Sequence, residues 1–140
     1  MRHLVREAGL DDKIEIDSAG TAGYHSGELP DSRARACGKR RGVEIGGRAR
    51  QFKSADFARF DYVLAMDRSN FEDLEELAAK VDSDKRQRLH LLRAFDPESP
   101  KGAGVPDPYY GGDDGFDDVF DICLSACKGL LEVIRREHRL

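Results

Sequence analysis

Apolar residues recur along the chain with two different periods, which predicts strands alternating with helices. A continuous apolar run over residues 62–66 has the length of a strand that is covered on both faces. Ile14, Ile16 and the small residues after Asp17 predict a second strand that leaves the sheet at Gly20, and the apolar stretch over residues 89–95 predicts a third. Strands alternating with helices favour an α/β fold, in which a parallel sheet carries helices on both faces.

Apolar residues spaced three and four apart, together with capping residues, predict the helices. The predicted segments are residues 2–8, 32–41, a short turn around Asp56, 69–81 and 115–137. Gly9 and Gly42 are suited to end the first two helices. Ser69, with Glu72 three places later, predicts a capping box at the start of the fourth. Asp67 is a second candidate to cap that helix.

Composition and charge narrow the class of protein. The 140 residues are 39% hydrophobic and 36% charged, which predicts one globular domain over residues 1–140. The formal net charge of −4 argues against general nucleic-acid binding. Three cysteines do not make a disulfide framework, and neither a signal peptide nor a long apolar run is seen. We therefore expect a soluble cytoplasmic protein with no membrane partner.

The charges gather in two segments of opposite sign. Residues 33–53 contain eight basic side chains, and residues 107–121 contain six acidic side chains and no basic one. Two solvated faces would explain this pattern. The alternatives are a basic rim that attracts anionic substrates, or two patches that meet between subunits.

A proline-bounded acid is the strongest candidate for chemistry. Asp107 stands between two prolines and is followed by Tyr109 and Tyr110. Proline restricts the backbone, so this carboxyl is held on a stiff loop beside aromatic rings, an arrangement that suits a general acid. A surface turn before a helix is the simpler interpretation.

Three motifs in order carry a resemblance to a known family. They are residues 17–21 (DSAGT), residues 61–70 (DYVLAMDRSN) and residues 107–110 (DPYY). In this order and spacing the chain closely resembles the low-molecular-weight protein tyrosine phosphatases over nearly its whole length. The resemblance implies a four-stranded parallel sheet, of which this chain supplies three strands. It also implies hydrolysis of phosphotyrosine proteins or small aryl phosphates, without a metal or other cofactor.

The resemblance also implies roles for individual side chains. The residues concerned are Asp107, Tyr109, Tyr110, Tyr24, His25 and Ser18. The aspartate is the family's general acid, and the adjacent tyrosine pair walls its pocket. Tyr24 and His25 lie in the loop that contributes to substrate choice, and Ser18 supports the phosphate-binding loop. Simple packing of the tyrosine pair, a turn at His25 and a strand end at Ser18 are the alternatives.

One expected motif is absent from these residues. The family's phosphate loop reads Cys, five residues, Arg, and it supplies the nucleophile and the phosphate-binding guanidinium. The positions six places after Cys37, Cys123 and Cys127 hold Val43, Gly129 and Val133. We therefore expect a chain without the first strand and the loop, inactive alone, whose incomplete sheet rearranges or forms a homodimer. A catalytically silent binding module is the alternative, and an arsenate reductase relative is disfavoured by the cysteine positions.

Overall fold

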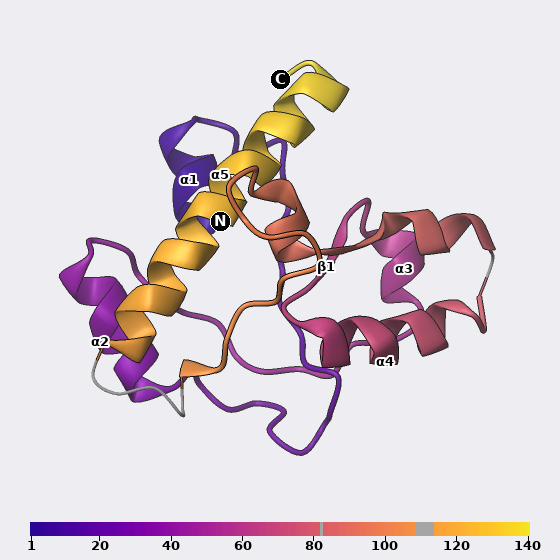
Figure 1. Ribbon diagram of the computed structural model, residues 1–140, viewed down its shortest axis with the longest axis horizontal. Helices are drawn as coiled ribbons and strands as arrows, with labels where there is room; N and C mark the ends of the chain where they lie inside the picture. The colour runs from indigo at the N-terminus through magenta and orange to yellow at the C-terminus, as the bar shows by residue number, and fades with distance from the viewer. Residues whose placement is uncertain (82, 109–113) are drawn as a thin grey trace.

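The computed structural model describes residues 1–81, 83–108 and 114–140 (Figure 1). Its elements in chain order are α1 (Arg2–Glu7), α2 (Ser32–Arg40), α3 (Asp56–Arg59), β1 (Val63–Ala65), α4 (Arg68–Ala78), η1 (Ser83–Arg88), β2 (Leu89–Leu91), η2 (Leu92–Phe95) and α5 (Gly115–His138). The two strands pair in parallel with Val63 opposite Leu89 and Ala65 opposite Leu91. The α/β class with a parallel sheet and flanking helices is therefore confirmed.

Local signals set the ends of the first two helices. Asp31 caps α2 because its carboxylate accepts the Arg33 backbone N–H at 2.8 Å. Gly9 and Gly42 follow α1 and α2 with φ of +70° and +77°, the left-handed conformation that glycine adopts without strain. The sequence predicted both stops.

The cap of α4 is Asp67 rather than Ser69. The Asp67 carboxylate accepts the Asn70 backbone N–H at 2.7 Å, so the helix begins at Arg68. Ser69 lies inside the first turn, where it cannot also be the cap, and the predicted capping box with Glu72 is wrong. The helix also ends at Ala78, earlier than its apolar periodicity suggested.

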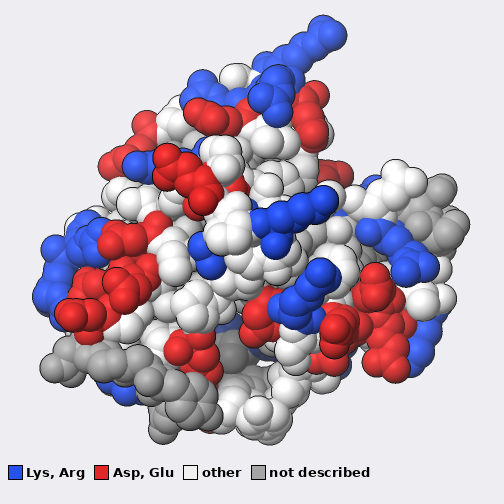
Figure 2. All heavy atoms as spheres, in the orientation of Figure 1, with Lys and Arg blue, Asp and Glu red and all other residues white. Residues whose placement is uncertain are grey.

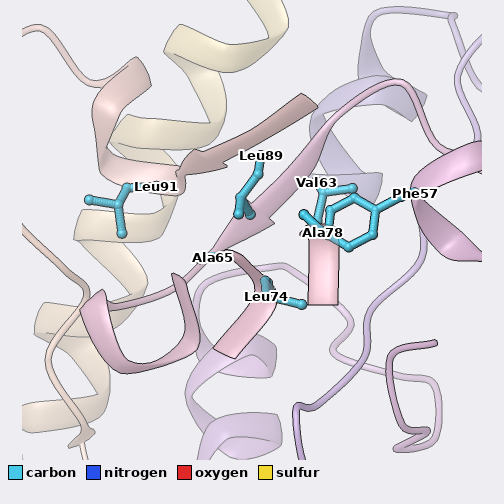
Figure 3. Close-up of a cluster of buried hydrophobic side chains, with 7 residues drawn as sticks. All are labelled: Phe57, Val63, Ala65, Leu74, Ala78, Leu89 and Leu91. Carbon is cyan, nitrogen blue, oxygen red and sulfur yellow. The ribbon is translucent and has the colours of Figure 1, made fainter. Parts of the chain in front are cut away.

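The two faces of the sheet are covered by different helices. On one face, Phe57 of α3 and Leu74 and Ala78 of α4 pack against alternate residues of both strands (Figure 3). On the other, Leu64 contributes to a second core built on the long helix α5, whose buried residues include Leu130 and Ile134. In Figure 1 this long helix and α4 lie in separate parts of the molecule.

The strand predicted from Ile14 to Gly20 does not form in the described residues. In the described residues the sheet has two strands, and the only pairing near this segment is an isolated parallel bridge between Gly20 and Gln51. A strand exists through its neighbours, and no partner pairs with residues 14–19. The predicted count of three strands is therefore wrong. The strand predicted over 89–95 is also shorter, because a 3-10 helix, η2, begins at Leu92.

The two segments of opposite charge meet within the chain. Arg40 of α2 approaches Asp117 of α5 at 3.3 Å, and Arg41 contacts both Asp117 and Asp121. Basic and acidic side chains accordingly lie side by side over these helices, at the left of Figure 2. The charge pattern thus joins α2 to α5 and needs no second subunit. Among the described residues, no helix is both long enough and apolar enough to cross a membrane.

Candidate active site

A cavity of about 790 Å³ lies along one edge of β1. Its wall includes every residue of β1 and none of β2, so it faces the edge that β2 does not cover. Residues 13–21 form the opposite wall, and α5 supplies Cys127, Leu130 and Ile134. Parallel α/β sheets place their sites at the carboxyl ends of the strands, and this cavity reaches that end at Met66.

Ser18 is the predicted site residue that this cavity includes. It lines the wall together with Met66 and Asn70, which follow β1. Its backbone N–H donates to the Asp17 carboxylate at 2.8 Å, which fixes the local turn. The 17–21 motif and the end of β1 therefore line the same cavity.

An arginine-centred ion-pair network holds the 17–21 motif in place. Arg50 donates from Nε to Asp17 at 3.0 Å and from Nη1 to Asp56 at 2.9 Å. Burial acts to raise the pKa of Asp56, but hydrogen bonds from Arg50 and from the Lys53 backbone N–H outweigh it and lower that pKa. No local pattern in the sequence indicates this network, because Arg50 and Asp17 are 33 residues apart.

The loop that carries Asp107 is anchored to the same end of β1. The Val105 backbone N–H donates to the Met66 carbonyl at 2.7 Å, and Arg93 donates to the Gly104 carbonyl at 2.9 Å. A Cβ at position 104 would lie 3.0 Å from Asp67, so glycine permits the close approach. Asp107 itself is exposed and does not line the cavity.

The structure does not bring Tyr24 or His25 into the cavity wall. Tyr24 is 80% exposed and its ring centroid lies 4.4 Å from that of His25. His25 contacts Glu28 at 2.9 Å, and neither Tyr24 nor His25 lines the cavity. Tyr109 and Tyr110 lie outside the described residues.

Two of the three thiols are in environments that favour the protonated form. Burial, together with its hydrogen bond to Asp117 at 3.3 Å, raises the pKa of the Cys37 thiol. Burial, with a smaller contribution from Cys127, raises the pKa of Cys123 to about 11. A nucleophilic thiol needs the opposite shift, so neither is prepared for attack. Within the described part of the chain, no group of His, Cys, Asp or Glu could hold a metal ion.

Comparison with known proteins agrees with this arrangement of motifs. The family model described as low molecular weight phosphotyrosine protein phosphatase matches residues 1–140. The chain belongs to the low-molecular-weight protein tyrosine phosphatase family. The Homo sapiens low molecular weight phosphotyrosine protein phosphatase is 40% identical over 131 residues, which are 94% of this chain and 81% of that relative. The Streptomyces coelicolor low molecular weight protein-tyrosine-phosphatase is 41% identical over 138 residues, 97% of this chain and 82% of that relative.

A solved structure of a phosphatase shows that the fold of this chain is also that of the family. A protein tyrosine phosphatase from Entamoeba histolytica, crystallised with Hepes in its active site, superposes with a TM-score of 0.88 at 36% identity. The match covers 99% of this chain and 86% of that one. The two-stranded sheet, its flanking helices and the loop before Asp107 therefore lie in the framework of this phosphatase family.

Proposed function

We propose that this chain carries the framework and the general acid of a phosphatase that hydrolyses phosphotyrosine-type substrates. The observation that carries the proposal is the family match over residues 1–140. The hydrogen bond from the Val105 backbone N–H to the Met66 carbonyl supports it, because this bond holds the Asp107 loop near the C-terminal end of β1. On this proposal the 140 residues act as one domain, and the unbridged cysteines fit a cytoplasmic setting.

The proposed chemistry assigns each predicted residue a role. Asp107 protonates the leaving phenolic oxygen and then activates water. Ser18 orients the phosphate-binding loop. Tyr24 and His25, with the tyrosine pair after Pro108, contact the substrate's aromatic ring and its surroundings.

According to the same proposal, the 140 residues alone do not hydrolyse the substrate. No cysteine among them is followed six places later by an arginine, so the sequence contains no loop that joins nucleophile and phosphate-binding guanidinium. Burial raises the pKa of both the Cys37 and the Cys123 thiols, which argues against a substitute thiolate. Losing donors that stabilise transition-state charge costs about 2.7–4 kcal/mol each, in addition to the loss of covalent catalysis.

A chimera tests the two parts of the proposal together. The 140-residue chain is assayed with an aryl phosphate, beside a version preceded by a strand and Cys-X5-Arg loop from the human relative. We expect no turnover from the first and turnover from the second. In the chimera, Asp107→Asn is expected to lower kcat about 100-fold or more, the range of general acid catalysis.

Asp114→Asn is the matched control, because this acid lies at the start of α5 and its side chain makes no capping hydrogen bond. It is expected to leave kcat unchanged. Equal losses in both variants would contradict the role of Asp107. Turnover by the 140 residues alone would contradict the proposed inactivity.

Association into a homodimer remains a separate proposal, motivated by the incomplete sheet. The two-stranded sheet leaves one edge of β1 against a cavity, and edges of this kind invite pairing with another chain. Light scattering on the purified 140-residue protein measures the mass directly. A cooperatively folding monomer at all concentrations would contradict the homodimer.

A further inference from the structure

We propose that Arg93 is a positioning residue for the general acid, because its guanidinium sets the place of the Asp107 carboxyl through a single peptide group. That group, the anchor peptide, joins Gly104 to Val105. The inference rests on the proposed role of Asp107. It adds to that role a side chain outside the three motifs that carry the family resemblance.

The anchor peptide is held at both of its polar ends. Its carbonyl, that of Gly104, accepts a hydrogen bond from Nη1 of Arg93 at 2.9 Å. Its N–H, that of Val105, donates to the Met66 carbonyl at 2.7 Å. A peptide group is planar, so two such contacts fix the orientation of the whole plane. Because Arg93 lies in η2 and Met66 follows β1, the anchor peptide joins η2 to the C-terminal end of β1.

Little conformational freedom remains between the anchor peptide and the Asp107 carboxyl. Val105 is buried, and the next residue is Pro106, whose ring restricts the backbone. On the other side of Asp107, the segment packs against the start of α5, where a Cβ at Gly115 would lie 3.1 Å from the Pro108 carbonyl oxygen. A displaced anchor peptide would therefore displace Asp107 as well.

The element that carries Arg93 is a rigid base for this contact. η2 packs directly on α5, where a Cβ at Gly129 would lie 1.9 Å from the Phe95 carbonyl oxygen. Leu92, the neighbour of Arg93, is buried in the same core as Leu130 of α5. A side chain on such a base holds its partner more precisely than a side chain on a loop.

The Arg93 side chain is not fully satisfied, which argues against a purely stabilising role. Among the described residues, its Nε is buried and has no hydrogen-bond partner. A buried donor without a partner lowers the stability of the fold and calls for an explanation. The contact with Gly104 supplies one, because the conformation that brings Nη1 to this carbonyl leaves Nε without an acceptor.

Amide hydrogen exchange tests the anchor peptide in the 140-residue protein, without any need for turnover. Arg93→Met removes the donor and keeps an unbranched stem, and exchange at the Val105 N–H is expected to become about tenfold faster or more. Arg88→Met is the matched control, because Arg88 of η1 also donates to backbone carbonyls, those of Phe57 and Phe60 at 3.1 Å. It is expected to leave exchange at Val105 unchanged.

The dependence of the rate on the leaving group tests the catalytic consequence, in the chimera that carries the human Cys-X5-Arg loop. A general acid matters most for a poor leaving group, because a good one departs without a proton. Arg93→Met is expected to lower kcat/KM about tenfold for phenyl phosphate, but less than about threefold for para-nitrophenyl phosphate. A merely damaged fold would lower both values equally. Arg88→Met should leave the ratio of the two values unchanged.

A double variant separates this inference from the proposed function. Because Arg93 acts through Asp107, Arg93→Met should lower kcat/KM little further when Asp107→Asn is already present. A normal kcat in Asp107→Asn alone would contradict the proposed function. A large loss in Asp107→Asn, with a separate and additive loss from Arg93→Met, would contradict only the positioning role.

Three outcomes would overturn the positioning role of Arg93. They are unchanged exchange at Val105, equal losses for the two substrates, and additive losses in the double variant. A melting curve for each variant shows that it folds. Arg93→Gln is the second variant, because it keeps a polar side chain that is too short to reach the Gly104 carbonyl. It is expected to speed exchange at Val105 as Arg93→Met does, and unchanged exchange in this variant would equally overturn the proposal.

Discussion

The two edges of β1 differ in what supports them. On one edge, β2 pairs with β1 through three residues, and η2 then packs closely against α5. On the other edge, a cavity of about 790 Å³ separates β1 from residues 14–19. The paired edge is supported by backbone hydrogen bonds and close packing. Across the open edge, residues 14–19 are held by side-chain contacts on the far wall of the cavity, such as those of Arg50.

That far wall shows how a segment can keep its place without a sheet. Arg50 joins Asp17 to Asp56, and Gly20 bonds to the backbone of residues 50–52. The 17–21 motif is therefore supported from outside the molecule's core rather than by β1. Ion pairs and turns thus hold the 17–21 motif beside a strand edge that the described chain leaves unpaired.

The largest loss of stability is expected where η2, which follows the paired strand β2, packs against α5. A Cβ at Gly129 of α5 would lie 1.9 Å from the Phe95 carbonyl oxygen of η2, so Gly129→Ala must push these elements apart. We expect a loss of about 3 kcal/mol in the free energy of unfolding, measured by urea titration.

Gly46→Ala is the matched control, because nothing lies within 4 Å of its added Cβ. It is expected to change stability by less than about 0.5 kcal/mol. Similar losses in both variants would mean that the close contact between α5 and η2 is not tight in solution. The contrast between the two edges would then be much weaker.

The fold could be predicted from the sequence wherever the signal is local. The apolar run at β1, the glycine stops of α1 and α2, and the apolar face of α5 all lie within one element. The strand predicted from Ile14 to Gly20 does not form, because strand pairing depends on a neighbour distant in the sequence, which no local pattern indicates. Two suitable caps, Asp67 and Ser69, stood two residues apart, and only the geometry of the first turn chooses between them.

The candidate site could be predicted only in part, for the same reason. The motif around Asp107 and the motif around Ser18 were recognised from short segments of sequence. Their support was not, since the Arg50 network and the contact between Val105 and Met66 join residues far apart in the chain. Contacts of this length leave no periodic trace in the sequence.

An intermediate loss of stability is expected at the open edge of β1, where Arg50 and Asp56 support the far wall of the cavity. Asp56 is buried and accepts hydrogen bonds from Arg50 and from the Lys53 backbone N–H. Asp56→Asn removes the charge, and we expect a loss of about 2 kcal/mol at neutral pH. Asp12→Asn, at an exposed turn, is the control and is expected to have almost no effect.

The pH dependence gives this variant a second readout. Since the folded-state pKa of Asp56 is lowered below its ordinary value of 3.8, its ionised form stabilises the fold above that value. That stability is lost as the pH falls through the folded-state pKa. The difference between wild type and Asp56→Asn should therefore shrink below about pH 4. A constant difference down to pH 2 would mean that packing, not charge, makes the contribution.

The smallest expected effect lies away from both edges, where α2 meets α5. Arg41 contacts Asp117 and Asp121, and its guanidinium also lies 4.6 Å from the Phe120 ring centroid. Because exposed ion pairs contribute little and are screened by salt, Arg41→Gln should lower the melting temperature slightly. The decrease should be smaller still in 1 M salt, and Lys101→Gln, at an exposed turn, is the control. If the decrease is unchanged by salt, stacking on Phe120 rather than charge joins α2 to α5. The contact between the two charged segments would then be a packing contact, like those of the paired edge.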